Sequence, residues 1–260
     1  MITTIRAELV KLRTTRLPLG LLALAAGLNA LVAVVTSARA GSGSSFAIPP
    51  LDTTAGLRMV LTSTGFALLV AMVFGVTVAS GEFRHRTATD TYLDQPNRVR
   101  VLLAKAVAAA GVGLVFGLVG AAITTGVGLA FVAAKGDQVA LAAGTIARFA
   151  AGTVLGSGLL AAVGVGIGSL LRGQVAAVIT VFVWAFGIEQ IVGGLSRSIA
   201  PYLPYTAAAT MAGATGGEGM PQLPSGLNPL PFGTVAALLV GVAVVLSTLA
   251  ARTTVQRDIT

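Results

Sequence analysis

The sequence predicts an all-α membrane protein with six transmembrane helices, an N-terminal interfacial helix, and N and C termini in the cytoplasm. Of its 260 residues, 55% are hydrophobic and only 10% are charged, whereas a soluble domain carries about 25% charged residues. Six apolar segments approach the roughly 20 residues that a spanning helix needs. The Lys and Arg residues are unevenly divided between the segments that connect these spans.

Residues 1–16 are expected to form a cytoplasmic amphipathic surface helix. Four apolar residues share one face of this helix and two charged residues lie away from it: Ile2, Ile5, Leu9 and Leu12 on the face, and Glu8 and Lys11 off it. Such a helix would lie along the inner membrane surface, with Lys11 and Arg16 near anionic head groups. The alternative is a frayed basic tail that only sets topology, and the apolar periodicity favours the helix.

Residues 17–251 form the predicted six-helix transmembrane domain. By length and hydropathy, its spans run over roughly 17–38, 58–80, 106–133, 149–170, 174–193 and 232–251. Between the spans lie a cytoplasmic loop over 81–105 and an extracellular segment over 194–231. A cytoplasmic tail over 252–260 follows the last span. Because prolines break helices, the Pro-rich extracellular segment predicts a broken cap with a short re-entrant piece around 206–212.

The distribution of positive charge sets the expected orientation. With the N-terminus in the cytoplasm, twelve of the 17 Lys and Arg residues lie on the inner side, and cytoplasmic segments of membrane proteins carry such an excess. This orientation also places the charged run SGEFRHRTATDTYLDQPNRVRVLLAK, residues 80–105, inside the cell.

The sequence lacks the motifs of several enzyme classes. No G-x-x-x-x-G-K-[ST] occurs, so the chain binds no nucleotide by that route, and neither G-x-S-x-G nor H-E-x-x-H is present. One His and no Cys exclude a multi-His or thiolate metal site within the chain. We therefore expect no catalytic residue, cofactor or metal in this chain, and no nucleic-acid partner.

The charged run between the second and third spans has two interpretations. It could be a solvated loop whose cations enforce topology, a rule that counts Lys and Arg. Its acids, among them Glu82 and Asp90, do not serve that purpose. Mixed charges around Tyr92 and Leu93 suit the docking of a protein. The residues alone leave both interpretations open.

The same run resembles the first cytoplasmic loop of the type-2 ABC transporter permeases, the exporter family of six-span subunits. That loop reads approximately E-x-R-x-G-T-x-x-x-x-L-x-x-P-x-R and ends in a basic A-K pair. The residues that match are Glu82, Arg84, Thr87, Leu93, Pro96, Arg98, Ala104 and Lys105. Arg86 stands where the family usually has glycine.

Two further stretches are similar to the same family, so the resemblance covers essentially the whole chain. RAELVKLRTTR is similar to its N-terminal surface helix, through Glu8, Lys11, Leu12 and Arg16. FVWAFGIEQIVGGLSRSIAPYLPYTAA is similar to its fifth span and the extracellular segment that follows, through Trp184, Glu189, Tyr202, Leu203 and Pro204.

The resemblance implies a permease subunit of an ATP-driven exporter in a bacterial cytoplasmic membrane. Two copies of a separate ATPase subunit would bind ATP and Mg, and a second permease chain, identical or related, would face this one across the transport path. The residues implied in ATPase coupling are Glu82, Arg84, His85, Arg86, Thr87, Asp90 and Leu93. Those implied at the membrane surface or loop boundary are Lys11, Arg16, Pro96, Arg98 and Lys105.

The alternatives are a non-transporting membrane anchor or sensor that docks a cytoplasmic partner, and a self-sufficient secondary carrier. The carrier is disfavoured because the spans hold few ionisable groups. The Ala-rich, Arg-over-Lys composition suggests an actinobacterial source.

Two polar residues within the spans are candidates for the translocation path or outer gate. Asn29 could line the path, or bond across to a neighbouring helix or the partner permease. Glu189 could act at an outer gate, with Arg148 as a partner, or be a capping or interfacial acid that reaches water. Glycines four residues apart, such as Gly113 and Gly117, would allow helices to approach closely.

Overall fold

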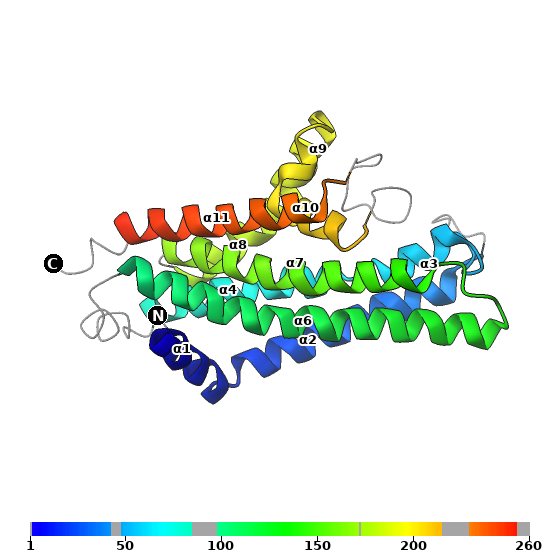
Figure 1. Ribbon diagram of the computed structural model, residues 1–260, viewed down its shortest axis with the longest axis horizontal. Helices are drawn as coiled ribbons and strands as arrows, with labels where there is room; N and C mark the ends of the chain where they lie inside the picture. The colour runs from blue at the N-terminus through cyan, green and yellow to red at the C-terminus, as the bar shows by residue number, and fades with distance from the viewer. Residues whose placement is uncertain (1, 43–47, 85–97, 172, 215–228, 254–260) are drawn as a thin grey trace.

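The computed structural model describes residues 2–42, 48–84, 98–171, 173–214 and 229–253, and within these ranges the chain is all-helical. Six segments are long and apolar enough to cross a membrane, which confirms the predicted all-α, six-span class. The spans other than the fifth run roughly along the long axis of the molecule (Figure 1). Helix α1 and the C-terminal end of α11 lie at the same end of the bundle, called here the α1 end.

The helices follow one another with these bounds: α1 Ile2–Thr14, α2 Leu17–Arg39, α3 Thr54–Leu61, α4 Gly65–Arg84, α6 Arg98–Lys135, α7 Ala143–Leu170, α8 Gln174–Phe182, the π-helix η1 Val183–Ile188, α9 Glu189–Leu195, the 3-10 helix η2 Ala200–Tyr202, α10 Pro204–Met211 and α11 Phe232–Arg252. Helices α3 and α4 together make the second span, and α8, η1 and α9 make the fifth.

The second span begins earlier than the predicted 58–80 and is interrupted. Thr53 caps the start of α3, since the Gly56 N–H donates to its Oγ1 over 3.1 Å. Helix α3 then stops at Leu61, and three hydroxyl residues separate it from α4. The Ser63 hydroxyl donates to the Val60 carbonyl over 2.6 Å, a local bond of the kind that competes with continued helix.

The third span is longer than predicted because α6 starts inside the expected loop 81–105. It begins at Arg98, two residues after Pro96, and continues for 38 residues to Lys135. At 1.5 Å per residue this is about 57 Å, well beyond the roughly 30 Å of a hydrocarbon core. The first two turns of α6 therefore form a stem of the loop and carry Lys105.

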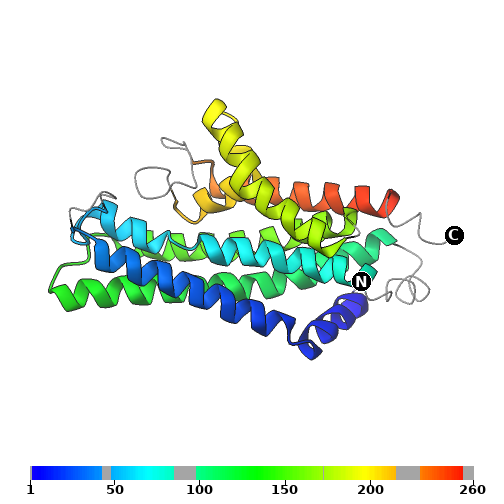
Figure 2. The same ribbon diagram turned by 180° about the vertical axis from the view of Figure 1, so that it is seen from behind.

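The fifth span is one continuous helical rod with a π-helical centre. Its α8 half packs against α4, while α9 projects away from the bundle (Figures 1 and 2). The sequence predicted a single regular helix over 174–193 and gave no signal for the wider turn. Helix α10 covers most of the short piece expected around 206–212 and is buried from Tyr205 to Met211.

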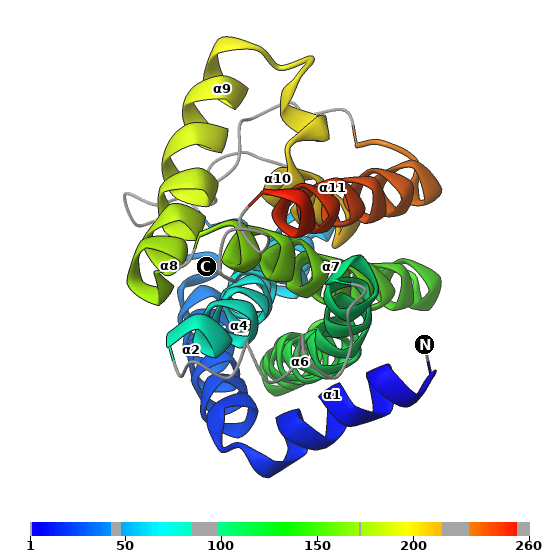
Figure 3. The same cartoon turned by 90° about the vertical axis from the view of Figure 1, so that its left-hand side faces the viewer.

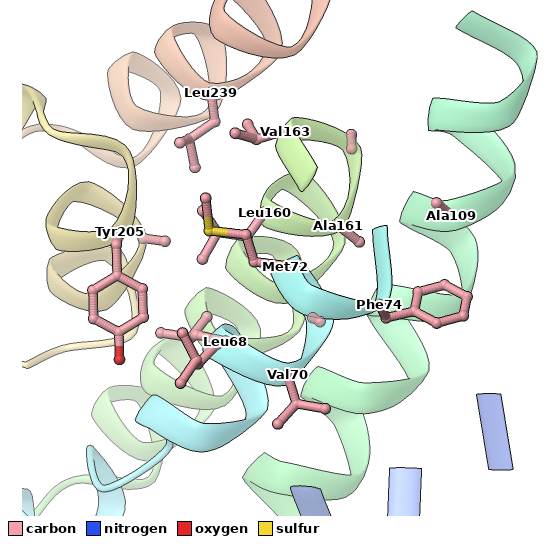
Figure 4. Close-up of a cluster of buried hydrophobic side chains, with 14 of the residues drawn as sticks. Leu68, Val70, Met72, Phe74, Ala109, Leu160, Ala161, Val163, Tyr205 and Leu239 are labelled. Carbon is pink, nitrogen blue, oxygen red and sulfur yellow. The ribbon is translucent and has the colours of Figure 1, made fainter. Parts of the chain in front are cut away.

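Helix α7 is the centre of the bundle. It packs extensively against α6, α4 and α11, and more lightly against α10. Figure 4 shows side chains from four helices meeting beside it: Leu68 and Met72 from α4, Leu160 from α7, Tyr205 from α10 and Leu239 from α11. Each is almost fully buried.

Glycine allows this close packing, and the four-residue spacing in the sequence is compatible with it. A Cβ on Gly113 or Gly117 would lie 2.7 or 2.6 Å from a backbone oxygen of α7. A Cβ on Gly164 would collide with the Met72 carbonyl oxygen of α4. Small residues matter at such interfaces because lipid removes most of the hydrophobic drive between helices, so backbone approach and van der Waals contact must hold them together.

We predict that Gly164→Ala destabilises the bundle while Gly111→Ala does not. The added methyl has no space between α4 and α7 at position 164, and overpacking of this kind costs about 1–3 kcal/mol. At position 111 nothing lies within 4 Å of the new Cβ. Thermal unfolding of the two variants in the same detergent compares them, and equal midpoints would contradict the packing described here.

Candidate functional site

Four charged residues from three helices form an ion cluster at the α1 end. The Lys105 ammonium of α6 lies 2.7 Å from Glu8 Oε2 and 2.6 Å from Glu82 Oε1. The Lys11 ammonium lies 2.8 Å from Glu8 Oε1 and 3.4 Å from Glu82 Oε1. Each base thus contacts both acids, and the cluster joins α1 to the end of α4 and the start of α6.

The cluster has a dry side and a wet side. The side chains of Lys105 and Glu8 are 2% and 4% exposed, whereas those of Glu82 and Lys11 are 14% and 49% exposed. Solvent and salt screen the inner pair much less than the outer one. Two positive and two negative charges balance within the cluster, so the buried ammonium and carboxylate compensate one another.

Helix α1 packs through a face that overlaps the predicted one and is turned toward Glu8: Leu12 is buried and Leu9 packs against the core, as expected. Its buried strip is Thr4, Glu8 and Leu12, residues four apart on one side of a helix. The expectation that Glu8 lies away from the packed face was therefore wrong. The reason is Lys105, because a cation buried on α6 requires an acid opposite it. Val10, in contrast, is 60% exposed.

The ion pairs keep the two cluster residues on α1, Glu8 and Lys11, charged at neutral pH. Burial acts to raise the pKa of the Glu8 carboxyl, but the charge and hydrogen bond of Lys105, assisted by Lys11, bring that pKa below its usual value. Burial acts to lower the pKa of Lys11, but its contacts with Glu8 and Glu82 hold that pKa above its usual value.

The structure brings together some of the residues expected at the loop and leaves others out. Glu8, Lys11, Glu82 and Lys105 meet in the cluster, although we had expected Glu82 to face an ATPase and Lys105 only to mark the membrane boundary. Arg84 ends α4, Arg98 begins α6, and Arg16 is exposed at the start of α2. The remaining coupling and boundary residues lie outside the described ranges: His85, Arg86, Thr87, Asp90, Leu93 and Pro96.

Glu189 organises a second polar cluster where the fifth span meets α10, beside the middle of the bundle (Figure 1). Its side chain is fully buried. Oε1 accepts from Trp184 Nε1 over 2.7 Å and from the Tyr205 N–H over 2.9 Å. Oε2 accepts from the Thr206 N–H and hydroxyl over 2.7 and 2.8 Å. The carboxylate thus caps the N-terminus of α10, where helix N–H groups lack partners and the dipole favours negative charge.

The π-helix η1 gives the Glu189 cluster its geometry. Trp184 and Glu189 are five residues apart, and the wider turn between them brings the indole N–H to the carboxylate. The Gln190 side chain spans the same interval, donating to the Ala185 carbonyl over 3.2 Å. Tyr205 then extends the contact to α4, because its hydroxyl donates to the Gly65 carbonyl over 3.3 Å.

These contacts decide between some of the alternatives that the sequence left open for Glu189 and Asn29. Glu189 is a capping acid that does not reach solvent, and Arg148 is exposed on α7 and is not its partner. Asn29 is also fully buried, and its amide donates to Ala25 within α2 over 2.8 Å, so the expected bond across to another helix is not seen. A translocation role for either residue stays a prediction. Sequence reasoning missed Thr206, which no motif marked.

The described part of the chain contains no group of three or more His, Cys, Asp or Glu that could hold a metal ion. Both acids of the ion cluster are satisfied by lysine ammonium groups. The chemistry of the two clusters is therefore electrostatic attachment and helix capping.

We predict a pH-dependent loss of stability for Glu8→Gln. The pKa of Glu8 is lowered from 4.5 in the folded protein, so its stabilisation is complete above pH 4.5 and is lost as the pH falls through the folded pKa. The variant should be less stable at pH 7 by about 2 kcal/mol, the size of a charged hydrogen bond. Denaturation at pH 7 and at pH 3.5 should show the deficit shrinking on acidification. Asp52→Asn, at an exposed acid, is the control, and a constant deficit for Glu8→Gln contradicts the assignment.

We predict that Thr206→Val is more damaging than Thr210→Val. Both threonines lie buried on α10, but only Thr206 donates its hydroxyl to Glu189, while Thr210 donates to Ala207 within its own helix. Losing a hydrogen bond to a carboxylate costs about 1.5–3 kcal/mol. Unfolding midpoints measured side by side test the difference, and similar losses would argue against the cap.

Comparison with protein-family models and with curated proteins finds no match for the sequence. What is shown about this protein therefore comes from its fold. It is an all-helical, multi-pass membrane protein with six candidate spans in the part of the chain that the structure describes.

Proposed function

We propose that this chain is the membrane-spanning permease subunit of an ATP-driven ABC exporter, which moves a substrate outward when a separate ATPase subunit acts on the loop between α4 and α6. The observation that carries the proposal is the ion cluster. Both stems of the loop contribute to it, through Glu82 and Lys105, and both are attached there to α1.

The first support is the lack of a motor in the chain. Its sequence has no phosphate-binding G-x-x-x-x-G-K-[ST] motif. A motion driven by ATP must therefore enter through contact with another protein, and only a contact that differs between nucleotide states can shift the conformation. The loop between α4 and α6 is the longest connection at the α1 end, and it carries mixed charges suited to such a contact.

The second support is the match between the ion cluster and the resemblance to the type-2 permeases. Glu82 and Lys105 come from the two ends of the loop pattern, and Glu8 and Lys11 come from the stretch that is similar to the family's N-terminal surface helix. Residues that carry two separate parts of the resemblance thus meet in one place. The excess of Lys and Arg in the segments at this end of the bundle favours a cytoplasmic location for it.

The complete exporter would contain two ATPase subunits, which bind ATP and Mg, and a second permease chain, identical or related, in a bacterial cytoplasmic membrane. Helix α2 and the fifth span expose apolar side chains such as Leu31, Ile179 and Ile191, which suit contact with lipid. The scarcity of polar groups in the spans favours an amphipathic or lipid-like substrate.

We predict that the tagged chain, purified from its native membrane, retains an ATPase subunit and that Glu82→Lys uncouples ATP hydrolysis from export. The substitution sets a third cation beside Lys105 and Lys11. The two lysines would then repel the α4 stem, which they attract in the wild-type protein. ATP turnover of the purified complex, and export of a compound that stimulates this turnover, measure the effect.

The control for Glu82→Lys is Asp52→Lys, the same charge reversal at an exposed acid ahead of α3. It should behave as wild type. A wild-type chain that retains a partner without ATP turnover would instead indicate a membrane anchor or sensor. Transport by vesicles that hold the chain alone would indicate a secondary carrier. Either result overturns the proposal.

A further inference from the structure

Helix α1 is attached more firmly to the loop stems than to the span that follows it in sequence. It packs more extensively against α6 than against α2, although only two residues separate it from α2. It lies at an angle to α2 (Figure 1), and in the end-on view it passes beside α6 (Figure 3). Its position is therefore set by the side chains that hold it to the stems.

The ion cluster is an unusual way to hold a helix in place. Replacing a buried ion pair with apolar residues of similar volume is often neutral or stabilising. Leucine or methionine at positions 8 and 105 would thus serve simple adhesion equally well. What an ion cluster adds is a fixed arrangement, because each ammonium must remain within reach of both carboxylates.

The pattern of contacts makes the two stems and α1 depend on one another. Lys105, on the α6 stem, divides its bonds between Glu8 of α1 and Glu82 of the α4 stem. Lys11 closes the ring from the exposed side, near the same two acids. A displacement of either stem relative to the other must break or move a contact to α1.

We propose that α1 is a coupling element and that Glu8 is its positioning residue: through Lys105 and Glu82 it holds the two loop stems and α1 as one body, so that a push on the loop is transmitted to α1 and onward to α2. This inference rests on the proposed function, since it needs an ATPase that pushes the loop. It gives Glu8 a role in force transmission that adhesion of α1 does not require.

The test uses a double variant that removes the buried charges together. Glu8→Met with Lys105→Met leaves no uncompensated charge in the dry part of the cluster, so the chain should fold. Lys11 and Glu82 keep their 3.4 Å contact. Lys105→Arg preserves the charge, and Arg6→Gln removes a cation from an exposed position of the same helix.

Three quantities are measured on each purified complex: the unfolding midpoint, the amount of ATPase subunit retained, and the stimulation of ATP turnover by the permease. We expect the Met/Met variant to keep the first two and to lose stimulation about fivefold or more, the scale of a coupling free energy between sites. Lys105→Arg should retain most of the stimulation, and Arg6→Gln all of it.

The outcomes separate the two proposals. A wild-type complex without permease-dependent ATP turnover contradicts the proposed function, and the inference with it. If the wild-type complex shows such turnover and the Met/Met variant is stimulated equally, only the inference is overturned. The cluster then does no more than hold α1 in place. Should the Met/Met variant lose its ATPase subunit or its stability together with turnover, the cluster is structural and the inference is equally wrong.

Discussion

The close backbone contact of α7 with its neighbours is the constraint on which the bundle depends. In a lipid environment helices gain little from hiding apolar side chains from each other, so they must be held by near contact and by polar bonds. Gly113 and Gly117 on α6, and Gly164 on α7, provide that contact by leaving no side chain between backbones. This packing fixes α4, α6 and α7 as a compact unit, and everything at the two ends of the bundle is positioned relative to it.

Two polar clusters attach more peripheral elements to this unit. At the α1 end, Lys105 and Glu82 extend from α6 and α4 to hold α1 through Glu8. Further along the bundle, Glu189 of the fifth span caps α10, and Tyr205 joins α10 to α4. One cluster uses opposite charges, and the other gives a carboxylate only neutral donors. Both place polar groups where they are fully paired, since unpaired ones are costly away from water.

In the exporter that we propose, this division of the molecule would give different tasks to its parts. The glycine-packed centre resists internal rearrangement, so a push at the α1 end moves several spans together. The fifth span packs less extensively on its neighbours than α7 does, and its α9 part is connected to the rest chiefly through the Glu189 cap and its η2 neighbour. In that proposal, force would enter at the ion cluster.

The sequence by itself determined the class of the fold, the number of spans and their approximate positions along the chain. The reason is that a run of about 20 apolar residues has few other stable states in a chain so poor in charge. Glu8, Glu82, Lys105 and Glu189 were also among the residues that carry the resemblance to the type-2 permeases. Only the tertiary structure decided what they contact. The face of α1, the break before α4, and the π-turn that brings Trp184 to Glu189 depend on which partners lie opposite. A pattern read along one helix contains no information about a charge buried on another, and the energy of a buried charge is decided by its partner.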